Sequence, residues 1–378
     1  MLGWVAFAVT AVVSAVGENK LMPPADFSCK VINGKTGYAR DNRSWIVGRI
    51  VRDFETWMDK QPRKQRQSAI PRDEGQKTIQ IRFQEMIESK WNELKVHAKA
   101  KGGPEPERPF KAGLCVSVYT AQKAIKGCPG YDAPYITGIL LSIVQLGVAA
   151  IPCGMFHDWN ILLVTAAGIA LSFSSGALSQ WSKEKWPCRS NTRKTFVLTT
   201  GSGSQHAIVI QGCGVGLDLE DLAANAPGAF TSQGTRAAII VLCVFWILLL
   251  ITAAGVKQHT WFLLAVGALG ILQNVFAAGT SRSPKAFGIP LEFVEVIGEP
   301  KVMDTLFEVE TRYPCLGKSL LPIFFPGELH EEEQERWDSF DSFAEMKRRG
   351  EKKKEESNNS EIPRSIPGVQ KGQYGDEA

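Results

Sequence analysis

The 378-residue chain lacks the residue spacings by which metal and nucleotide sites are usually recognised. Its eight cysteines show no paired spacing, which argues against both a zinc site and a disulfide framework. Its five histidines lie far apart and form no multiple-histidine box of the kind that membrane di-iron enzymes need. The glycines of 212–216 read G-x-G-x-G, which is not the dinucleotide-binding spacing G-x-G-x-x-G. We therefore expect no cofactor and no metal.

Charge is absent from four long segments, 135–156, 160–178, 237–256 and 260–279, none of which contains Lys, Arg, Asp or Glu. A run of about 20 apolar residues is long enough for a helix to cross the roughly 30 Å of a bilayer's hydrocarbon core. Only three residues connect the first pair of segments, and three connect the second pair. The pattern predicts two transmembrane hairpins, at 135–179 and 237–279, in an integral, multi-pass protein whose first partner is the lipid bilayer.

The orientation of the hairpins follows from the distribution of basic residues, because Lys and Arg near the ends of spans are retained on the cytoplasmic side. Residues 18–134 hold 22 basic and 14 acidic residues, and residues 180–236 hold 6 and 4. We therefore expect both segments to be cytoplasmic. Four spans return the chain to its starting side, so the tail 280–378 is expected there as well. The sequence does not indicate which organelle holds the protein.

Residues 1–17 are apolar but leave several interpretations open. They fit an uncleaved anchor, a cleaved signal ending near Val13-Ser14-Ala15, an interfacial segment, or the remnant of a longer span. A cleaved signal would place the following region outside the cell or in a lumen. The sequon Asn42-Arg43-Ser44 would then be open to glycosylation.

The regions outside the hairpins have their own patterns. In the basic region 18–134, apolar residues at helical spacing predict amphipathic helices over 43–60 and 78–101, joined by a linker at 61–76. In the loop 180–236, two β-rich runs flank Gly201-Ser-Gly-Ser and predict a β-hairpin, after which Asp218 is expected to cap a short helix. A strand is expected within 287–297, and disorder after about residue 348.

The expected fold class is therefore mainly α: a multi-pass helical membrane protein with two transmembrane hairpins and a small α+β cytoplasmic elaboration. The N-terminal segment adds a further span if it is an uncleaved anchor. Some stretches carry a resemblance as well. Gly203-Ser-Gln-His206 is followed by an aliphatic strand and by the run 216–223, Gly-Leu-Asp-Leu-Glu-Asp-Leu-Ala. Together with 17–22 and 41–45, these stretches resemble an uncharacterised family of fungal multi-pass membrane proteins over roughly residues 2–300. The resemblance implies no activity.

Within the hairpins, small residues recur every four positions, which predicts close helix packing. These helix-packing candidates are Gly138, Ser142, Gly168, Ser172 and Gly176. The polar residues inside the spans are Gln145, Gln273 and Asn274, besides Ser and Thr. Polar side chains in a bilayer are costly and often functional, so Gln273 and Asn274 are weak functional candidates. Ser204 and His206 are a second weak pair, as nucleophile and base, although no nucleophile-elbow motif surrounds them.

We interpret the sequence as that of a non-enzymatic membrane scaffold or interaction protein. One alternative is a small-molecule or lipid transporter subunit that works as a homo-oligomer, and another is a membrane-bound enzyme. Convergence of Gln145, Gln273 and Asn274 on one cavity would favour transport, and His206 meeting a carboxylate and a Cys or Ser in a cleft would favour an enzyme. Basic amphipathic helices suggest contacts with anionic lipid. No nucleic-acid partner is expected.

Overall fold

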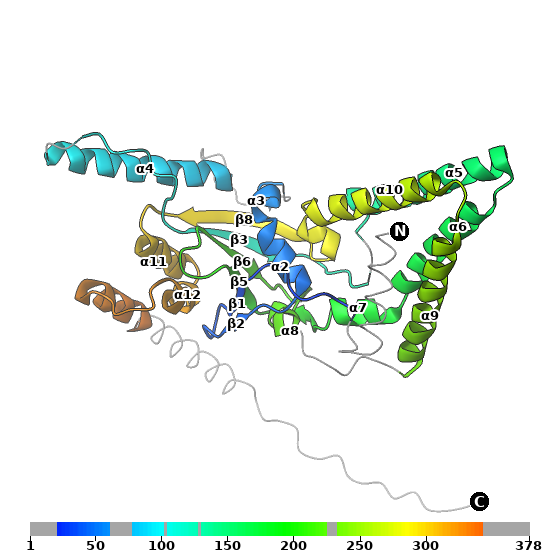
Figure 1. The fold of residues 1–378 in the computed structure, drawn as a ribbon. Coiled ribbons are helices and arrows are strands. Elements are labelled where there is room, and N and C mark those ends of the chain that lie inside the picture. Colours follow the sequence, from blue (N-terminus) through cyan, green and yellow to red (C-terminus); the bar gives the residue numbers. More distant parts are fainter. Residues whose placement is uncertain (1–20, 61–77, 102–103, 128–129, 225–232, 343–378) are drawn as a thin grey trace, which may run out of the picture. The chain divides into compact units, whose positions relative to one another are not determined.

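The computed structural model describes residues 21–60, 78–101, 104–127, 130–224 and 233–342 (Figure 1). The chain divides into two compact units, Met1–Phe324 and Phe325–Ala378. The expectations for residues 1–17, for the linker 61–76 and for disorder after about 348 lie outside the described residues.

A six-stranded sheet forms the centre of the first unit, and its strands come from all three segments that surround the two helical hairpins (Figure 1). The order of strands across the sheet is β2-β1-β5-β6-β3-β8. The strands are β1 (Lys30–Asn33), β2 (Ala39–Asp41), β3 (Cys115–Ala121), β5 (Thr195–Thr199), β6 (His206–Gln211) and β8 (Leu291–Gly298). A second, two-stranded sheet pairs β4 (Ser190–Thr192) with β7 (Gly216–Leu217).

Strand β3 lies in the interior of this sheet, and all seven of its residues are buried. It runs parallel to β6, with Cys115 opposite His206 and Thr120 opposite Gln211, and antiparallel to β8. A strand that is buried on both faces has no apolar/polar alternation. Ser117 and Thr120 interrupt the apolar residues of Cys115–Ala121 without a period of two, so this segment did not stand out as a half-buried strand.

Helices cover both faces of the sheet. On one face, the core contains side chains from α2 (Trp45–Arg52), α3 (Phe54–Trp57), α4 (Ile79–Ala100) and α8 (Leu219–Ala224). On the other face, α11 (Val302–Arg312) contacts β3 and β8, and α12 (Leu316–Phe324) contacts β1. Successive side chains of a strand point to opposite faces, so this arrangement buries both sets. The result is a three-layer α/β/α domain.

The structure corrects two expectations for residues 18–134. The region is not helical throughout, because it supplies β1, β2 and β3 to the sheet. The helix expected over 43–60 is two helices, α2 and α3, that break at Asp53, where φ is −90° and ψ is 8°. The carboxylate of Asp53 pairs with Arg52 at 2.7 Å and accepts a hydrogen bond from the backbone N–H of Arg282 at 2.9 Å. The β-hairpin expected in 180–236 is present as β5 and β6.

Three helices are long and apolar enough to cross a membrane: α5 (Ala133–Phe156), α9 (Gln233–Gly255, apolar from Gly234) and α10 (Thr260–Gly279). The fourth expected span is shorter than the sequence suggested. Helix α6 (Asn160–Gly176) ends two residues before Leu178, and the chain bends by 47° into α7 (Ser179–Lys185). The described residues therefore contain three such helices, or four if α6 and α7 form one bent span.

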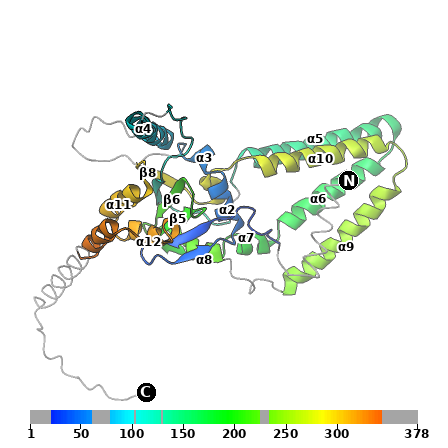
Figure 2. The same ribbon diagram turned by 60° about the vertical axis from the view of Figure 1, so that its left-hand side comes forward.

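The two hairpins lie side by side, with α5 beside α10 and α6 beside α9 (Figures 1 and 2). Their turns are alike, since His157 and His259 both adopt the left-handed conformation, with φ of 55° and 54°. The ring of Phe156 stacks on that of His259 at a centroid distance of 4.2 Å. Residues of all four helices near these turns form small apolar clusters, which contain Ala149, Ile161 and Leu263 among others.

The second unit contains a helical stretch at 331–342. The rings of Trp337 and Phe340 pack on each other within it, with centroids 5.9 Å apart.

Candidate functional site

A cavity of about 370 Å³ lies between α5, α6 and α10. Helix α5 lines it with Pro134, Tyr135, Gly138, Ile139, Leu141, Ser142 and Gln145; α6 with Ile169, Ser172 and Phe173; and α10 with Val266, Gly267, Gly270, Gln273 and Asn274. No Lys, Arg, Asp or Glu is among these residues. The cavity is therefore apolar, with a few amide and hydroxyl groups. Pockets of this size and character are typical of small-molecule sites.

Two glutamines connect α5 and α10 across the cavity. Gln145 on α5 donates a hydrogen bond from Nε2 to the carbonyl oxygen of Val266 on α10, at 3.0 Å. Gln273 on α10 donates from Nε2 to the carbonyl oxygen of Pro134 at 3.2 Å and to the hydroxyl of Thr137 at 3.0 Å, both on α5. The bond from Gln145 runs from α5 to α10, and the two bonds from Gln273 run from α10 to α5. Each amide thus stabilises the helix pair while its side chain lines the cavity.

The third polar residue, Asn274, also lines the cavity but is exposed, and no hydrogen bond of its side chain is found among the described residues. The structure therefore brings Gln145, Gln273 and Asn274 to one cavity, which is the feature expected of a transporter subunit. Only Asn274 has its whole amide available to a ligand, because the Nε2 groups of the two glutamines already donate to protein oxygens.

The five helix-packing candidates do not share one environment. Gly138, Ser142 and Ser172 line the cavity, whereas Gly168 is buried in α6 and does not line it. A methyl group added at Gly138 would lie 3.6 Å from Nε2 of Gln273, an ordinary contact, and one added at Gly176 would meet nothing within 4 Å. In the described residues, the small side chains at 138, 142 and 172 therefore leave space between helices and do not bring them into tight contact.

Ser204 and His206 do not form a nucleophile and base. The hydroxyl of Ser204 donates to the carbonyl oxygen of His206 at 2.8 Å and does not contact the imidazole. The ring of His206 lies between Phe54 and Phe83, with centroids 5.4 Å from each, and its buried Nδ1 has no hydrogen-bond partner among the described residues. Burial lowers the pKa of His206, although Glu55 opposes the shift. This histidine belongs to the aromatic core.

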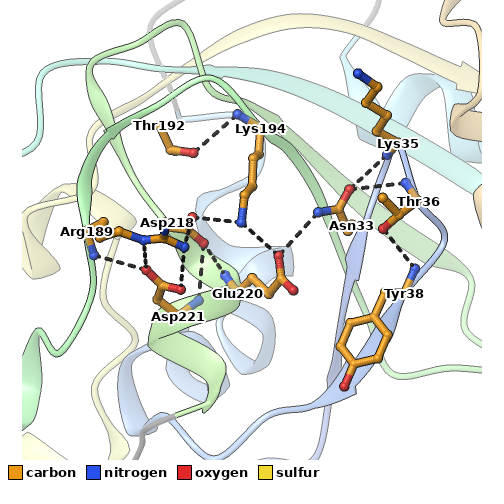
Figure 3. Close-up of polar contacts among 10 residues, drawn as sticks. All are labelled: Asn33, Lys35, Thr36, Tyr38, Arg189, Thr192, Lys194, Asp218, Glu220 and Asp221. Atoms are coloured by element: carbon orange, nitrogen blue, oxygen red, sulfur yellow. Dashed lines mark hydrogen bonds and ion pairs between the residues drawn. The ribbon is translucent and has the colours of Figure 1, made fainter.

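A network of charged residues joins β1, the segment before β5 and the start of α8 (Figure 3). Lys194 Nζ lies 3.0 Å from carboxylate oxygens of both Asp218 and Glu220, and Asn33 donates from Nδ2 to Glu220 at 3.2 Å. Partial burial opposes the charged form of Lys194, but these two carboxylates raise its pKa. The guanidinium of Arg189 donates two hydrogen bonds to Asp221, of 2.6 and 3.0 Å, and its backbone N–H donates a third, of 3.3 Å.

This network also confirms the cap predicted for α8. Asp218 Oδ1 accepts hydrogen bonds from the backbone N–H groups of Glu220 and Asp221, at 3.1 and 3.2 Å. The sequence contained no spacing that would have indicated the partners of Asp218, because Lys194 and Arg189 approach its carboxylate only in the folded domain. Within the described residues, no group of three His, Cys, Asp or Glu side chains is placed to hold a metal ion.

No family model, no curated protein and no solved structure matches this chain. The resemblance to fungal membrane proteins therefore stays an expectation from the sequence.

Proposed function

We propose that the chain crosses the membrane four times, with the sheet on the cytoplasmic side. Strands β3 and β6 are direct neighbours, and the chain between them contains α5 and α6. Strands β6 and β8 both pair with β3, and the chain between them contains α9 and α10. A hydrogen-bonded sheet cannot be divided by a bilayer, since its backbone groups must be paired. If α5 crosses, α6 must therefore cross back despite its short length, and the same holds for α9 and α10.

Single cysteines on a background without native thiols test this topology. Asp158→Cys lies in the first hairpin turn, and Lys301→Cys precedes α11 in the sheet domain. We expect a membrane-impermeant maleimide added to sealed, right-side-out vesicles to label the first cysteine directly and the second only after permeabilisation. Equal labelling of both before permeabilisation would contradict the four-crossing arrangement, and reversed labelling would contradict the cytoplasmic assignment.

We further propose that the protein is a membrane subunit that binds an uncharged amphipathic small molecule of the lipid class in the cavity between α5, α6 and α10. The observation that carries the proposal is the convergence of Gln145, Gln273 and Asn274 on this one cavity. The walls are mostly apolar and contain no charged side chain. Such a lining suits a molecule with an apolar body and a hydroxyl, ester or amide group that can bond to Asn274.

Transport would then require more than one copy of the chain. Four spans alone rarely enclose a pathway. The three candidate spans also leave most of their surface unburied, since only 11% to 22% of the most apolar stretch of each helix is buried inside the protein. Apolar faces of this size must meet lipid or another copy of the chain. The scaffold interpretation keeps the same topology but gives the cavity no role. The enzyme interpretation loses its supporting feature, because the ring contacts of His206 are with Phe54 and Phe83.

Two serines of α6 provide a matched test. Ser172 lines the cavity, whereas Ser174 does not, and the hydroxyl of each donates to the carbonyl oxygen four residues earlier, at 2.8 Å. Ser172→Leu fills the cavity, while Ser174→Leu adds the same volume elsewhere. We expect native mass spectrometry of the purified protein to find a retained lipid-class molecule in the wild type and in Ser174→Leu, and to find it lost in Ser172→Leu. Retention by Ser172→Leu, or no bound molecule in the wild type, would overturn the proposal.

A further inference from the structure

A second cavity, of about 650 Å³, lies in the sheet domain and is separate from the one between the helices. Its walls are the turn after β1, the segment that leads into β5, the end of β6 and the connection between α11 and α12. We call it the basic cleft. Four of its lining residues are cations, Lys35, Arg193, Lys194 and Arg312, and none is an Asp or Glu.

The four cations fall into two kinds. Lys194 and Arg312 form ion pairs with carboxylates that do not line the cleft. Lys194 pairs with Asp218 and Glu220 at 3.0 Å. Arg312 pairs with Glu295 at 2.6 Å and with Glu308 at 2.7 Å. These ion pairs fix the positions of both side chains. Lys35 and Arg193 are exposed, and neither has an ion-pair partner among the residues that the structure describes. Two positive charges at the cleft are thus unneutralised.

The turn after β1, which lines the cleft, packs tightly against its neighbours. Gly34 donates from its backbone N–H to the carbonyl oxygen of Thr195 at 2.8 Å, and a methyl group added at Gly34 would lie 2.8 Å from Cδ1 of Leu316. The turn after β1 therefore packs against both β5 and the start of α12. Asn33 Oδ1 accepts from the N–H groups of Lys35 and Thr36, which fixes the turn that carries Lys35 (Figure 3).

The strand register places the cleft at a defined end of the sheet. Gln211 and Thr195 pair with each other, and Gln211 also lies opposite Thr120, near the end of β3 from which the chain continues into α5. At this end, Lys126 donates from Nζ to the carbonyl oxygen of Cys188, in the segment between α7 and β4. The cleft thus lies at the end of the sheet to which the helical hairpins are attached.

We propose that the basic cleft binds a phosphomonoester. A phosphate monoester carries a charge of about −1.5 to −2 at neutral pH, which matches the two unpaired cations. The planar guanidinium of Arg193 can bond two phosphate oxygens at once, and Lys35 supplies a compact charge. The hydroxyl and amide groups of Thr195 and Gln211 line the same space and can bond the rest of the molecule. The group can belong to a soluble metabolite or to the headgroup of a lipid.

The test uses the full-length protein in nanodiscs and two probes. Glycerol 3-phosphate, added to nanodiscs of phosphatidylcholine, tests a soluble phosphomonoester by calorimetry. Phosphatidic acid, included in the nanodisc, tests the lipid source by the amount retained after exchange into detergent. The variant Lys35→Gln/Arg193→Gln removes the two unpaired cations. The matched control Lys99→Gln/Lys301→Gln removes the charge of two exposed lysines outside the cleft.

We expect at least one probe to bind the wild type and the control equally, and the cleft variant at least about tenfold more weakly, since a hydrogen bond to a charged group contributes about 1.5–3 kcal/mol. Binding of glycerol 3-phosphate alone assigns a soluble ligand, and retention of phosphatidic acid alone assigns a headgroup. The proposal is overturned if the wild type binds neither probe, or if the control loses as much as the cleft variant. It is also overturned if phosphatidylglycerol, a phosphodiester, is retained as well as phosphatidic acid.

Discussion

Arg49 donates a hydrogen bond from Nη1 to the carbonyl oxygen of Ala278, at 2.8 Å. Arg49 lies on α2 of the sheet domain, and Ala278 lies in the last turn of α10. The last carbonyl groups of a helix have no partner within it and carry partial negative charge, so a cation is favourable there. Asp26 holds the guanidinium from the other side, with an oxygen 2.7 Å from Nε. One side chain thus attaches the sheet domain to a helix that lines the helical cavity.

Removing this attachment should weaken the folded state at the base of α10. For Arg49→Gln we expect the free energy of unfolding to fall by about 2 kcal/mol, because a charged hydrogen bond and a partly buried ion pair are lost together. Thermal unfolding in detergent measures the loss, and hydrogen exchange should show faster exchange in 276–279. Arg108→Gln is the control, since Arg108 is exposed and its ion pair with the exposed Glu88 is longer, at 3.6 Å. Equal effects of the two variants would contradict the attachment.

The amides of Gln145 and Gln273 should contribute independently to the association of α5 with α10. For Gln145→Leu we expect a loss of about 0.5–1.5 kcal/mol, because a helix–helix hydrogen bond in an apolar medium is lost. Unfolding by a denaturing detergent measures it, and the double variant with Gln273→Leu should show nearly additive losses. Val144→Leu, a change at the neighbouring exposed position, should alter stability by less than about 0.5 kcal/mol. No loss in either glutamine variant would show that these bonds do not hold the pair.

Gly288 should tolerate no side chain. It has φ of 77°, and a methyl group there would lie 2.1 Å from the carbonyl oxygen of Ile125. We expect Gly288→Ala to cost more than about 2 kcal/mol, because both the backbone conformation and a rigid backbone contact oppose it. Gly147→Ala on α5 should cost little, since nothing lies within 4 Å of the added atom. The amount of folded protein after purification and the thermal midpoint compare the two variants.

His206 should make stability depend on pH. Burial lowers the pKa of His206 below its ordinary value of 6.5, so the unfolded chain binds a proton more readily than the folded one. The free energy of unfolding should therefore be highest above about pH 6.5 and should fall as the pH drops below that value. His206→Phe should flatten this part of the profile. An unchanged profile in His206→Phe would contradict the assignment.

Some elements of the fold could be predicted because their signals are local. The apolar segments at 135–156 and 260–279 are helices close to the expected bounds, since membrane-length hydropathy depends only on consecutive residues. The turn residues around Gly201 likewise indicated the hairpin of β5 and β6. In contrast, β1 pairs with β5 and β3 pairs with β8, and each pair is separated by more than a hundred residues of chain. No local sequence pattern records such pairing.

The site shows the same division. The sequence by itself determined that Gln145, Gln273 and Asn274 are the amides in the interior of the apolar segments, because composition alone distinguishes them from their neighbours. Only the tertiary structure decided that they line one cavity, that Ser204 and His206 make no catalytic pair, and that Lys35 and Arg193 share a cleft with Arg312. The physical reason is that hydropathy and helix length act along the chain, whereas cavities and charge clusters depend on which distant residues packing brings together.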